Sequence, residues 1–148
     1  MRFTWQPERF AAYAPLLLRV GIGFVFIWSG LEKLVGSGDA LGVCTNRAEA
    51  VSLVESFLWL PFDPEIFVFV QSVAELVLGA LLVLGFKVRP TAVGVALLLA
   101  SFFVLLDFNL IWKNVALLGA ALALIVLPRD PGSLDAWLEK RQVVVKSE

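Results

Sequence analysis

The stretch LLLRVGIGFVFIWSGLEKLVG, residues 16–36, decides the fold class of this chain. It is apolar over the length that a transmembrane helix needs, about 20 residues. Yet it contains Arg19 near one end and the adjacent Glu32 and Lys33 near the other. A charge inside a spanning helix costs about 2.5–3.5 kcal/mol on insertion scales and normally faces protein or water rather than lipid. These charges are therefore the first indication of a site inside a membrane domain.

The composition agrees with an integral membrane protein. Of the 148 residues, 59% are hydrophobic and only 17% are charged, whereas about a quarter of the residues of a soluble domain are charged. The net charge of −1 gives no basic surface for nucleic acid. The chain has no histidine and one cysteine, Cys44, which excludes an internal disulfide and disfavours haem, iron–sulfur and zinc sites. We expect no intrinsic cofactor, no metal and no autonomous enzyme activity.

The apolar residues fall in four blocks, which we predict to be transmembrane helices over residues 14–36, 65–86, 90–108 and 110–128. Asp63 and Pro64 form a start signal for the second helix, and Gly85 a stop signal. Pro90 opens the third helix and Pro128 closes the fourth. The first block is too long for the apolar core of a cleaved signal peptide, which spans about 7–15 residues. The prediction is an all-α, four-helix membrane bundle forming one domain over residues 1–148.

The loop charges predict the orientation of these helices. If both termini share one side, that side holds eight basic residues (Arg2, Arg9, Lys87, Arg89, Arg129, Lys140, Arg141 and Lys146), and the other side holds three (Lys33, Arg47 and Lys113). Basic residues concentrate in cytoplasmic loops. We therefore expect a plasma (inner) membrane protein with both termini and the tail 129–148 cytoplasmic and the first loop extracytoplasmic.

The first loop contains a predicted helix over residues 47–60. Asn46 and Glu49 have the spacing of a capping box. Glu49, Ser52 and Ser56 share one face, and apolar residues fill the others. We interpret this segment as an amphipathic helix that lies in the outer interface or folds over the bundle.

A deep group of polar residues lies within the first two predicted spans. Glu75 is about ten residues from either end of its span, hence near the bilayer midplane, and Gln71 and Ser72 lie on the same helical stripe. Arg19 either reaches inward toward Glu75 or extends to the headgroups. Glu75 is either a functional carboxylate or a protonated carboxyl that is hydrogen-bonded between helices. The sequence leaves both alternatives open.

A shallower group lies near the outer ends of the spans. At 100° per residue, Lys33 falls within about 40° of the face of Arg19, together with Gly23 and Gly30, and this face should look into the bundle. Glu32 points nearly opposite, and we expect it at the outer boundary on another face of the helix.

Together these residues predict a pocket open to the outer leaflet, lined by Lys33, Asp107, Lys113 and Asn114 and floored by Glu75 and Arg19, with Gln71 in support. Such a pocket would suit an apolar molecule with a polar head, such as a quinone or a lipid. The alternative is a set of ion pairs that only fix the register of the helices.

The fourth predicted span carries a row of small residues, Ala116, Ala120 and Ala123, with Gly119 beside it. Small residues let helices approach closely in membranes. We interpret the row as a contact within the bundle, and it would also permit a homodimer.

Three stretches, taken in order, resemble the DoxX family of small membrane proteins. They are LRVGIGFVFIWSGLEKL (18–34), AELVLGALLVLGFKVRPTAV (74–93) and KNVALLGAALALIVLPRDPGSLD (113–135), and the resemblance spans about residues 14–136. It implies a four-helix bundle with an amphipathic excursion after the first helix. It also implies that Arg19, Lys33, Glu75 and Asn114 occupy the recurrent polar positions of the family. Ser29 stands where many members carry histidine, which argues against histidine-based chemistry.

Family members have been linked to quinone-dependent sulfur oxidation, to oxidative-stress complexes and, in distant animal relatives, to receptor assembly. The first hypothesis is therefore a non-catalytic accessory or assembly subunit in the lipid bilayer. It would bind a lipid-like ligand or a membrane or periplasmic oxidoreductase. The alternative is a quinone-binding subunit of an oxidoreductase that uses the Arg/Glu/Lys pocket. A transporter is disfavoured, because no helix has the Gly/Pro interruption typical of a midplane site.

Overall fold

A computed structural model describes residues 12–35, 46–56, 63–105, 108–128 and 130–146, with side chains described except at 104–105, 108–113 and 142–146. Within these residues all regular secondary structure is helical, which confirms the all-α class. Six helices follow one another: α2 (Ala14–Val35), α3 (Arg47–Ser56), α4 (Pro64–Leu84), α5 (Val88–Leu105), α6 (Phe108–Val126) and α7 (Leu134–Lys146).

Two of these helices meet the requirement for crossing a membrane on their own. α2 and α4 have 22 and 21 residues and are strongly apolar. The apolar parts described for α5 and α6 are shorter, Val88–Phe103 and Asn114–Val126. The helix expected over 47–60 is observed as α3, and residues 57–60 lie outside the described part.

The ends of α4 show how local sequence sets its boundaries. Asp63 Oδ1 accepts a hydrogen bond from the Glu65 amide at 2.8 Å, and Pro64 occupies the first turn. Both features satisfy or remove amide donors that a helix N-terminus leaves unpaired. At the other end Gly85 adopts a left-handed conformation, with φ of 68°, and its amide bonds the Leu82 carbonyl at 3.0 Å. The PFDPE motif and Gly85 thus act as the sequence predicts.

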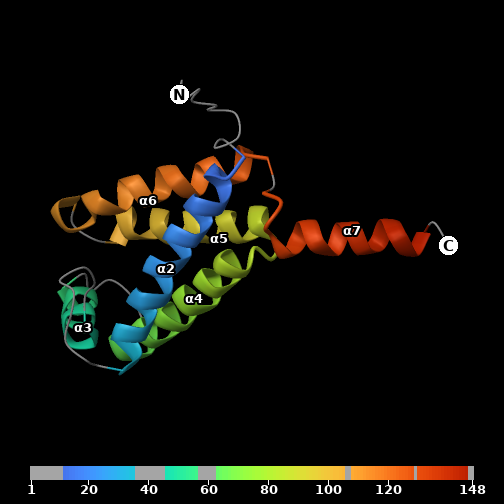
Figure 1. The fold of residues 1–148 in the computed structure, drawn as a ribbon. Coiled ribbons are helices and arrows are strands. Elements are labelled where there is room, and N and C mark those ends of the chain that lie inside the picture. The colour runs from blue at the N-terminus through green and yellow to red at the C-terminus, as the bar shows by residue number, and fades with distance from the viewer. Residues whose placement is uncertain (1–11, 36–45, 57–62, 106–107, 129, 147–148) are drawn as a thin grey trace, which may run out of the picture.

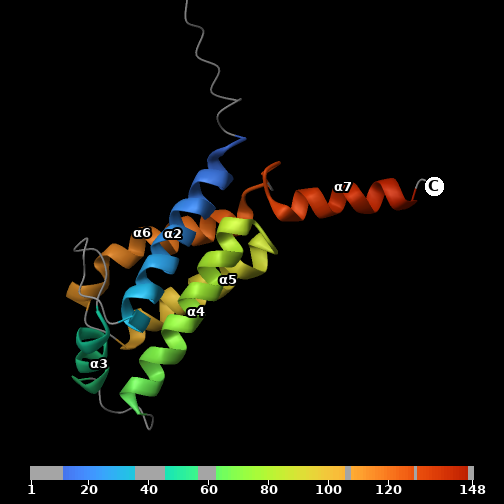
Figure 2. The ribbon, with the colours of Figure 1, turned by 60° about the horizontal axis from the view of Figure 1, so that its bottom comes forward.

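The four long helices pack in pairs. α2 lies along α4 and α5 along α6, with further contacts between α2 and α6 and between α4 and α5 (Figures 1 and 2). α3 contacts both α2 and α4 near the end where α2 finishes and α4 starts. The core between α2, α4, α5 and α6 consists of buried aliphatic and aromatic side chains. They include Ile22, Phe26, Leu82, Val95, Leu99 and Leu124.

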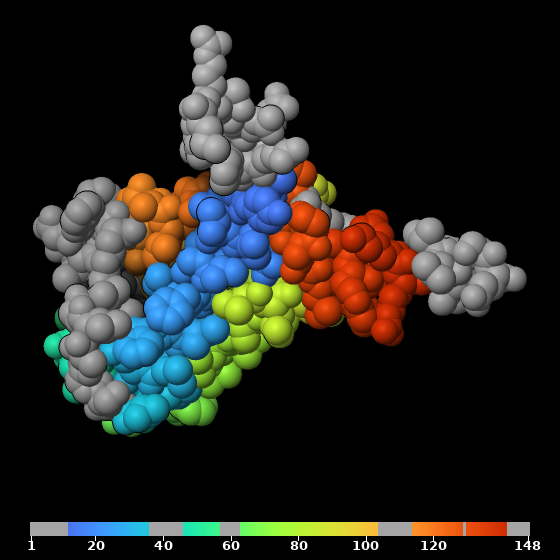
Figure 3. All heavy atoms as spheres, viewed as in Figure 1, coloured from blue at the N-terminus to red at the C-terminus, as the bar shows by residue number. Residues whose placement is uncertain are grey.

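Glycines bring the backbones of α2 and α4 into contact. A Cβ atom built on Gly23 would lie 2.8 Å from the Gly79 carbonyl oxygen, and one on Gly79 would lie 2.7 Å from the Gly23 oxygen. A Cβ on Gly30 would lie 2.7 Å from the Ser72 oxygen. Real Cβ atoms do not approach backbone this closely. The space-filling view shows the two helices side by side along their length (Figure 3).

The small residues of α6 behave differently from the prediction. Ala116 and Gly119 are exposed, and a Cβ on Gly119 would meet no atom within 4 Å. For these two residues the expected contact within the bundle is wrong, because α6 turns Ala121 and Leu124 toward the core instead.

Helix α7 (Leu134–Lys146) lies within the segment predicted as a cytoplasmic tail, residues 129–148. It projects away from the other helices in both ribbon views (Figures 1 and 2). Ser133 precedes it, and its Oγ accepts a hydrogen bond from the Ala136 amide at 3.2 Å, in the manner of an N-cap. The guanidinium of Arg141 stacks over the Trp137 ring at 4.1 Å.

Candidate functional site

A buried ion pair joins α2 to α4 near the C-terminal end of α2. Lys33 Nζ lies 2.6 Å from Glu75 Oε1 and 2.7 Å from Oε2, and it also donates to Ser29 Oγ at 3.1 Å. Gln71 Nε2 donates to Glu75 Oε1 at 2.9 Å. Lys33 and Glu75 are 6% and 3% exposed. We call Ser29, Lys33, Gln71 and Glu75 the Lys33–Glu75 cluster.

Arg19 belongs to a different network at the other end of α2. Its Nε donates to Asp130 Oδ2 at 2.9 Å and its Nη2 to Asp130 Oδ1 at 3.3 Å. The same guanidinium donates to the carbonyls of Leu82, Val83 and Gly132. Arg19 is only 2% exposed. It therefore neither extends to the headgroups nor pairs with Glu75; it ties the end of α4 and the loop after α6 to α2.

The segment 130–133 and the first residues of α7 complete this network. Asp135 accepts from the amides of Lys87 at 2.7 Å and Val88 at 3.0 Å, which caps the start of α5. The Asp135 amide in turn donates to the Gly85 carbonyl at 3.1 Å. The side chains of Arg19, Asp130 and Asp135 are therefore all engaged in contacts that hold the helices together. We call Arg19, Asp130 and Asp135 the Arg19–Asp130 clamp.

Asp130 was not predicted as the partner of Arg19. The available signal was its position, because Asp130 follows the last apolar block and this places it at the same end as the start of α2. Arg19 and Lys33 are 14 residues apart on α2, or about 21 Å at 1.5 Å per residue. The structure therefore does not bring Arg19 to the Lys33–Glu75 cluster.

The prediction for Glu32 is wrong. Glu32 is 4% exposed, although the helical angle placed it on a face away from the bundle. α2 packs against α3 and α6 as well as α4, so that its buried sector is wider than one stripe.

Two buried polar atoms on this side of α2 have no hydrogen-bond partner within the described part of the chain. They are Glu32 Oε2 and Trp28 Nε1. Trp28 and Glu32 are one helical turn apart and therefore lie on the same face. Glu32 Oε2 accepts hydrogen bonds when the carboxyl is ionised, whereas Trp28 Nε1 can only donate one. Unsatisfied buried polar atoms are rare in folded proteins and require an explanation.

The remaining predicted pocket residues are only partly described. Asn114 is half-buried in α6. Lys113 is described by its backbone alone, and Asp107 lies outside the described residues, as does Cys44. The pocket expected from Lys33, Asp107, Lys113 and Asn114 therefore stays a prediction. Among the residues with a described placement, no group of three His, Cys, Asp or Glu side chains is arranged to hold a metal ion.

Comparison with known families adds the decisive observation. The family model described as DoxX matches residues 14–107, which is more than half of the chain. The chain belongs to the DoxX family. This match covers α2 to α5 and so includes Arg19, Lys33, Gln71 and Glu75. It stops before the third stretch of the sequence resemblance, residues 113–135.

The family match and the two long apolar helices indicate a membrane protein that sits in a lipid bilayer. No curated protein and no solved structure matched the chain. The function of this DoxX protein therefore has to be inferred from its own residues.

Proposed function

We propose that this DoxX protein is a four-span subunit of the plasma membrane without catalytic activity of its own. It binds a lipid-like ligand with a polar head on the Trp28–Glu32 side of α2 and helps to assemble or anchor a membrane oxidoreductase. In this proposal α5 and α6 cross the bilayer together with α2 and α4. Both termini are cytoplasmic, and the first loop with α3 is outside.

The unsatisfied pair of polar atoms, Trp28 Nε1 and Glu32 Oε2, carries the ligand proposal. Leaving a buried donor or acceptor without a partner costs about 1–3 kcal/mol. A single hydroxyl group can accept a hydrogen bond from the indole N–H and donate one to the carboxylate. A hydroxylated head group therefore has the chemistry that both atoms lack in a partner.

The neighbouring Lys33–Glu75 cluster supports the proposal in a different way. Its charges neutralise each other and its polar atoms are hydrogen-bonded within the cluster. We assign it the role of fixing the position of α2 against α4, which holds Trp28 and Glu32 in place. In this proposal the Lys33–Glu75 ion pair fixes the register of the helices, and the ligand binds next to it rather than to it.

A quinone is the second candidate ligand, and the same two atoms favour it. The indole N–H can donate to a quinone carbonyl, and Glu32 can accept from the hydroxyl of the reduced form. The protein would then be the quinone-binding subunit of an oxidoreductase. The chain itself has no histidine and a single cysteine, so electrons would have to come from the partner.

The test is to identify molecules that remain bound to the purified protein. The protein is extracted with native membrane lipid, washed in mild detergent, and the retained small molecules are measured by mass spectrometry. Trp28→Phe removes the donor but keeps an aromatic ring, and Glu32→Gln keeps the size of the side chain. Glu32→Gln should lower the retained ligand roughly tenfold or more, because a hydrogen bond to a charged group contributes about 1.5–3 kcal/mol. Trp28→Phe should lower it roughly two- to tenfold, because a hydrogen bond between neutral groups contributes about 0.5–1.5 kcal/mol.

Glu65→Gln is the matched control. Glu65 forms an exposed ion pair with Arg47 at 3.2 Å and lies on α4, so this variant should retain the ligand like the unchanged protein. If Trp28→Phe and Glu32→Gln also retain it, or if no molecule is retained by any of them, the ligand proposal is wrong. A hydroxylated lipid in the retained fraction supports the first candidate, and a quinone supports the second.

The partner surface is proposed from the exposed face of α6. Ala116 and Gly119 are exposed there, next to Val115 and Leu122, which are each 50% exposed. Small residues on an apolar helix suit close helix packing in a membrane. A partner subunit or a second copy of the chain would therefore pack here. Gly119→Leu should weaken co-purification of that partner while leaving the fold unchanged, because a Cβ at Gly119 meets no neighbour within the chain.

A further inference from the structure

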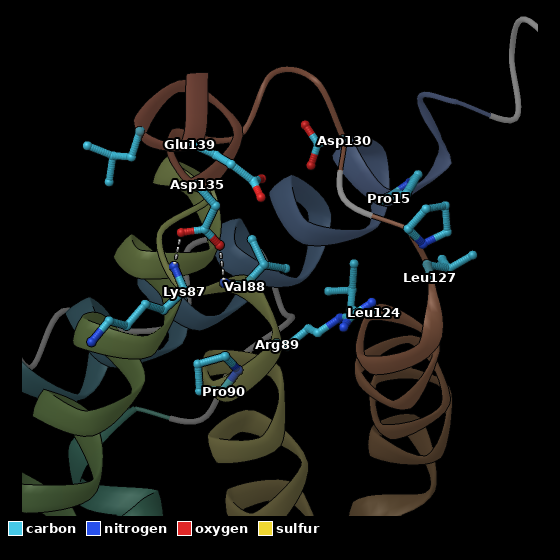
Figure 4. A pocket seen from close by; sticks show the side chains of 12 residues that line it. Pro15, Lys87, Val88, Arg89, Pro90, Leu124, Leu127, Asp130, Asp135 and Glu139 are labelled. Atoms are coloured by element: carbon cyan, nitrogen blue, oxygen red, sulfur yellow. Dashed lines mark hydrogen bonds between the residues drawn. The ribbon is translucent and has the colours of Figure 1, made fainter. Parts of the chain in front are cut away.

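A cavity of about 530 Å³ lies at the end of the molecule where α2 and α5 start and α6 finishes. Its walls include Pro15, Val88, Pro90, Leu124 and Leu127, and the start of α7 lies above it (Figure 4). The volume is within the range of small-molecule sites, about 300–1,000 Å³. This cavity is far from Trp28 and Glu32 and plays no part in the function proposed above.

The acidic groups around the cavity are already engaged. Asp130 is paired with Arg19, and Asp135 caps the amides of Lys87 and Val88. Glu139 also has a partner. The carboxylates are therefore not available as free sites for a cation.

Arg89 is one of two exposed basic residues that line the cavity, with Lys87. Among the described residues, none forms an ion pair with Arg89. Figure 4 shows its side chain extending from α5 toward Leu124 of α6, across the cavity, whereas the side chain of Lys87 points away. Arg89 also sits in the first turn of α5, where the helix dipole disfavours a cation. An anion beside Arg89 would relieve this repulsion.

The apolar surface next to the cavity fits a lipid chain. Val126, adjacent to the cavity residue Leu127, is 80% exposed, and Leu17, two residues after Pro15, is 71% exposed. Val126 and Leu17 are therefore exposed apolar residues close in sequence to residues that line the cavity.

We infer that this cavity binds the phosphate group of a phospholipid, with Arg89 as the phosphate ligand. The planar guanidinium can donate two parallel hydrogen bonds to two phosphate oxygens. The glycerol and the start of the acyl chains would lie against Leu124, Leu127 and the exposed residues beside them. A soluble phosphate ester offers the same phosphate chemistry without the chains.

The experiment uses the full-length protein, depleted of lipid in mild detergent, and native mass spectrometry to count bound molecules. Three probes separate the contribution of the phosphate group from that of the acyl chains. They are phosphatidylglycerol, the diacylglycerol with the same acyl chains, and glycerol phosphate. We expect phosphatidylglycerol to bind, and diacylglycerol and glycerol phosphate to bind at least tenfold more weakly. Arg89→Gln should reduce phosphatidylglycerol binding at least tenfold, and Arg89→Lys should restore part of it.

Arg141→Gln is the control, because Arg141 is also a basic residue near this end but stacks on Trp137 outside the cavity. It should bind phosphatidylglycerol like the unchanged protein. Glycerol phosphate binding as tightly as phosphatidylglycerol would keep the phosphate assignment and identify the ligand as soluble. Equal binding of diacylglycerol and phosphatidylglycerol, or undiminished binding to Arg89→Gln, would overturn the inference. Circular dichroism of Arg89→Gln checks that the variant is folded.

Discussion

Arg19 and Asp130 are 111 residues apart in the sequence and form a buried ion pair, with 2.9 Å between Nε and Oδ2. Arg19 also binds carbonyls at the end of α4 and in the loop after α6. One side chain therefore connects the first and last parts of the helix assembly. This explains the charge at the start of α2 without invoking a ligand.

Removing one partner of this pair should destabilise the protein strongly. Asp130→Asn leaves the Arg19 charge buried without a counterion, and breaking a buried pair in this way costs about 3–5 kcal/mol. The free energy of unfolding, measured by denaturant titration in detergent with circular dichroism, should fall by this amount.

The control for this change is Glu65→Gln in the exposed pair with Arg47. Exposed pairs contribute only about 0–1 kcal/mol, so its unfolding should be nearly unchanged. Equal effects of Asp130→Asn and Glu65→Gln would contradict the buried clamp.

The Lys33–Glu75 pair should show strong coupling in a double-mutant cycle. Lys33→Met and Glu75→Gln each leave one member of the pair without its partner, so each should destabilise by about 3–5 kcal/mol. The double variant should lose much less than the sum of the two single changes, because neither charge is left buried alone. Additive effects of the two substitutions would show that the residues do not contact each other in the folded protein.

The close contact between α2 and α4 should not tolerate a methyl group. Gly79→Ala would place a Cβ 2.7 Å from the Gly23 carbonyl oxygen, which is backbone and can move only with its helix. We expect a loss of about 1–3 kcal/mol from overpacking, measured as a lower unfolding temperature in detergent. Gly21→Ala on the same helix pair is the control, since its Cβ would meet no atom within 4 Å. A stabilising Gly79→Ala would mean that the helices are further apart.

Gly85 should be intolerant of a side chain for a different reason. Its φ of 68° disfavours residues with a Cβ by about 1–2 kcal/mol. A Cβ there would also lie 2.9 Å from Ser133 Cα and 3.0 Å from Arg19 Cζ. Gly85→Ala should therefore lower the unfolding temperature and expose the clamp to trypsin at Arg19. Gly119→Ala, which has free space around it, should do neither.

Periodicity and end signals were enough to predict the helical class and the ends of α4. The apolar blocks exceed any ordinary strand, and Asp63, Pro64 and Gly85 act through local backbone geometry. The glycine-marked face of α2 was also visible, because Arg19, Gly23, Gly30 and Lys33 share it and all four are buried.

The partners of the buried charges could not be predicted in the same way. Angular position on one helix says which side a residue faces, but not how far along a neighbouring helix its partner lies. The partner of Arg19 is in a loop rather than a span, and Glu75 lies closer to Lys33 than to Arg19. The burial of Glu32 could not be read from one polar stripe, because α2 is in contact with α3, α4 and α6.

The late position of Asp130 has a consequence for how the protein is made. Chains are synthesised at about 5–20 residues per second, so roughly 5–20 s separate Arg19 from the 111th residue after it. During that interval the first helix carries an arginine whose counterion does not yet exist. A nascent chain that stalls or is cut before the PRDPGSLD loop keeps this charge uncompensated. The ion pair that holds the start of α2 therefore forms only after almost the whole helix assembly has been synthesised.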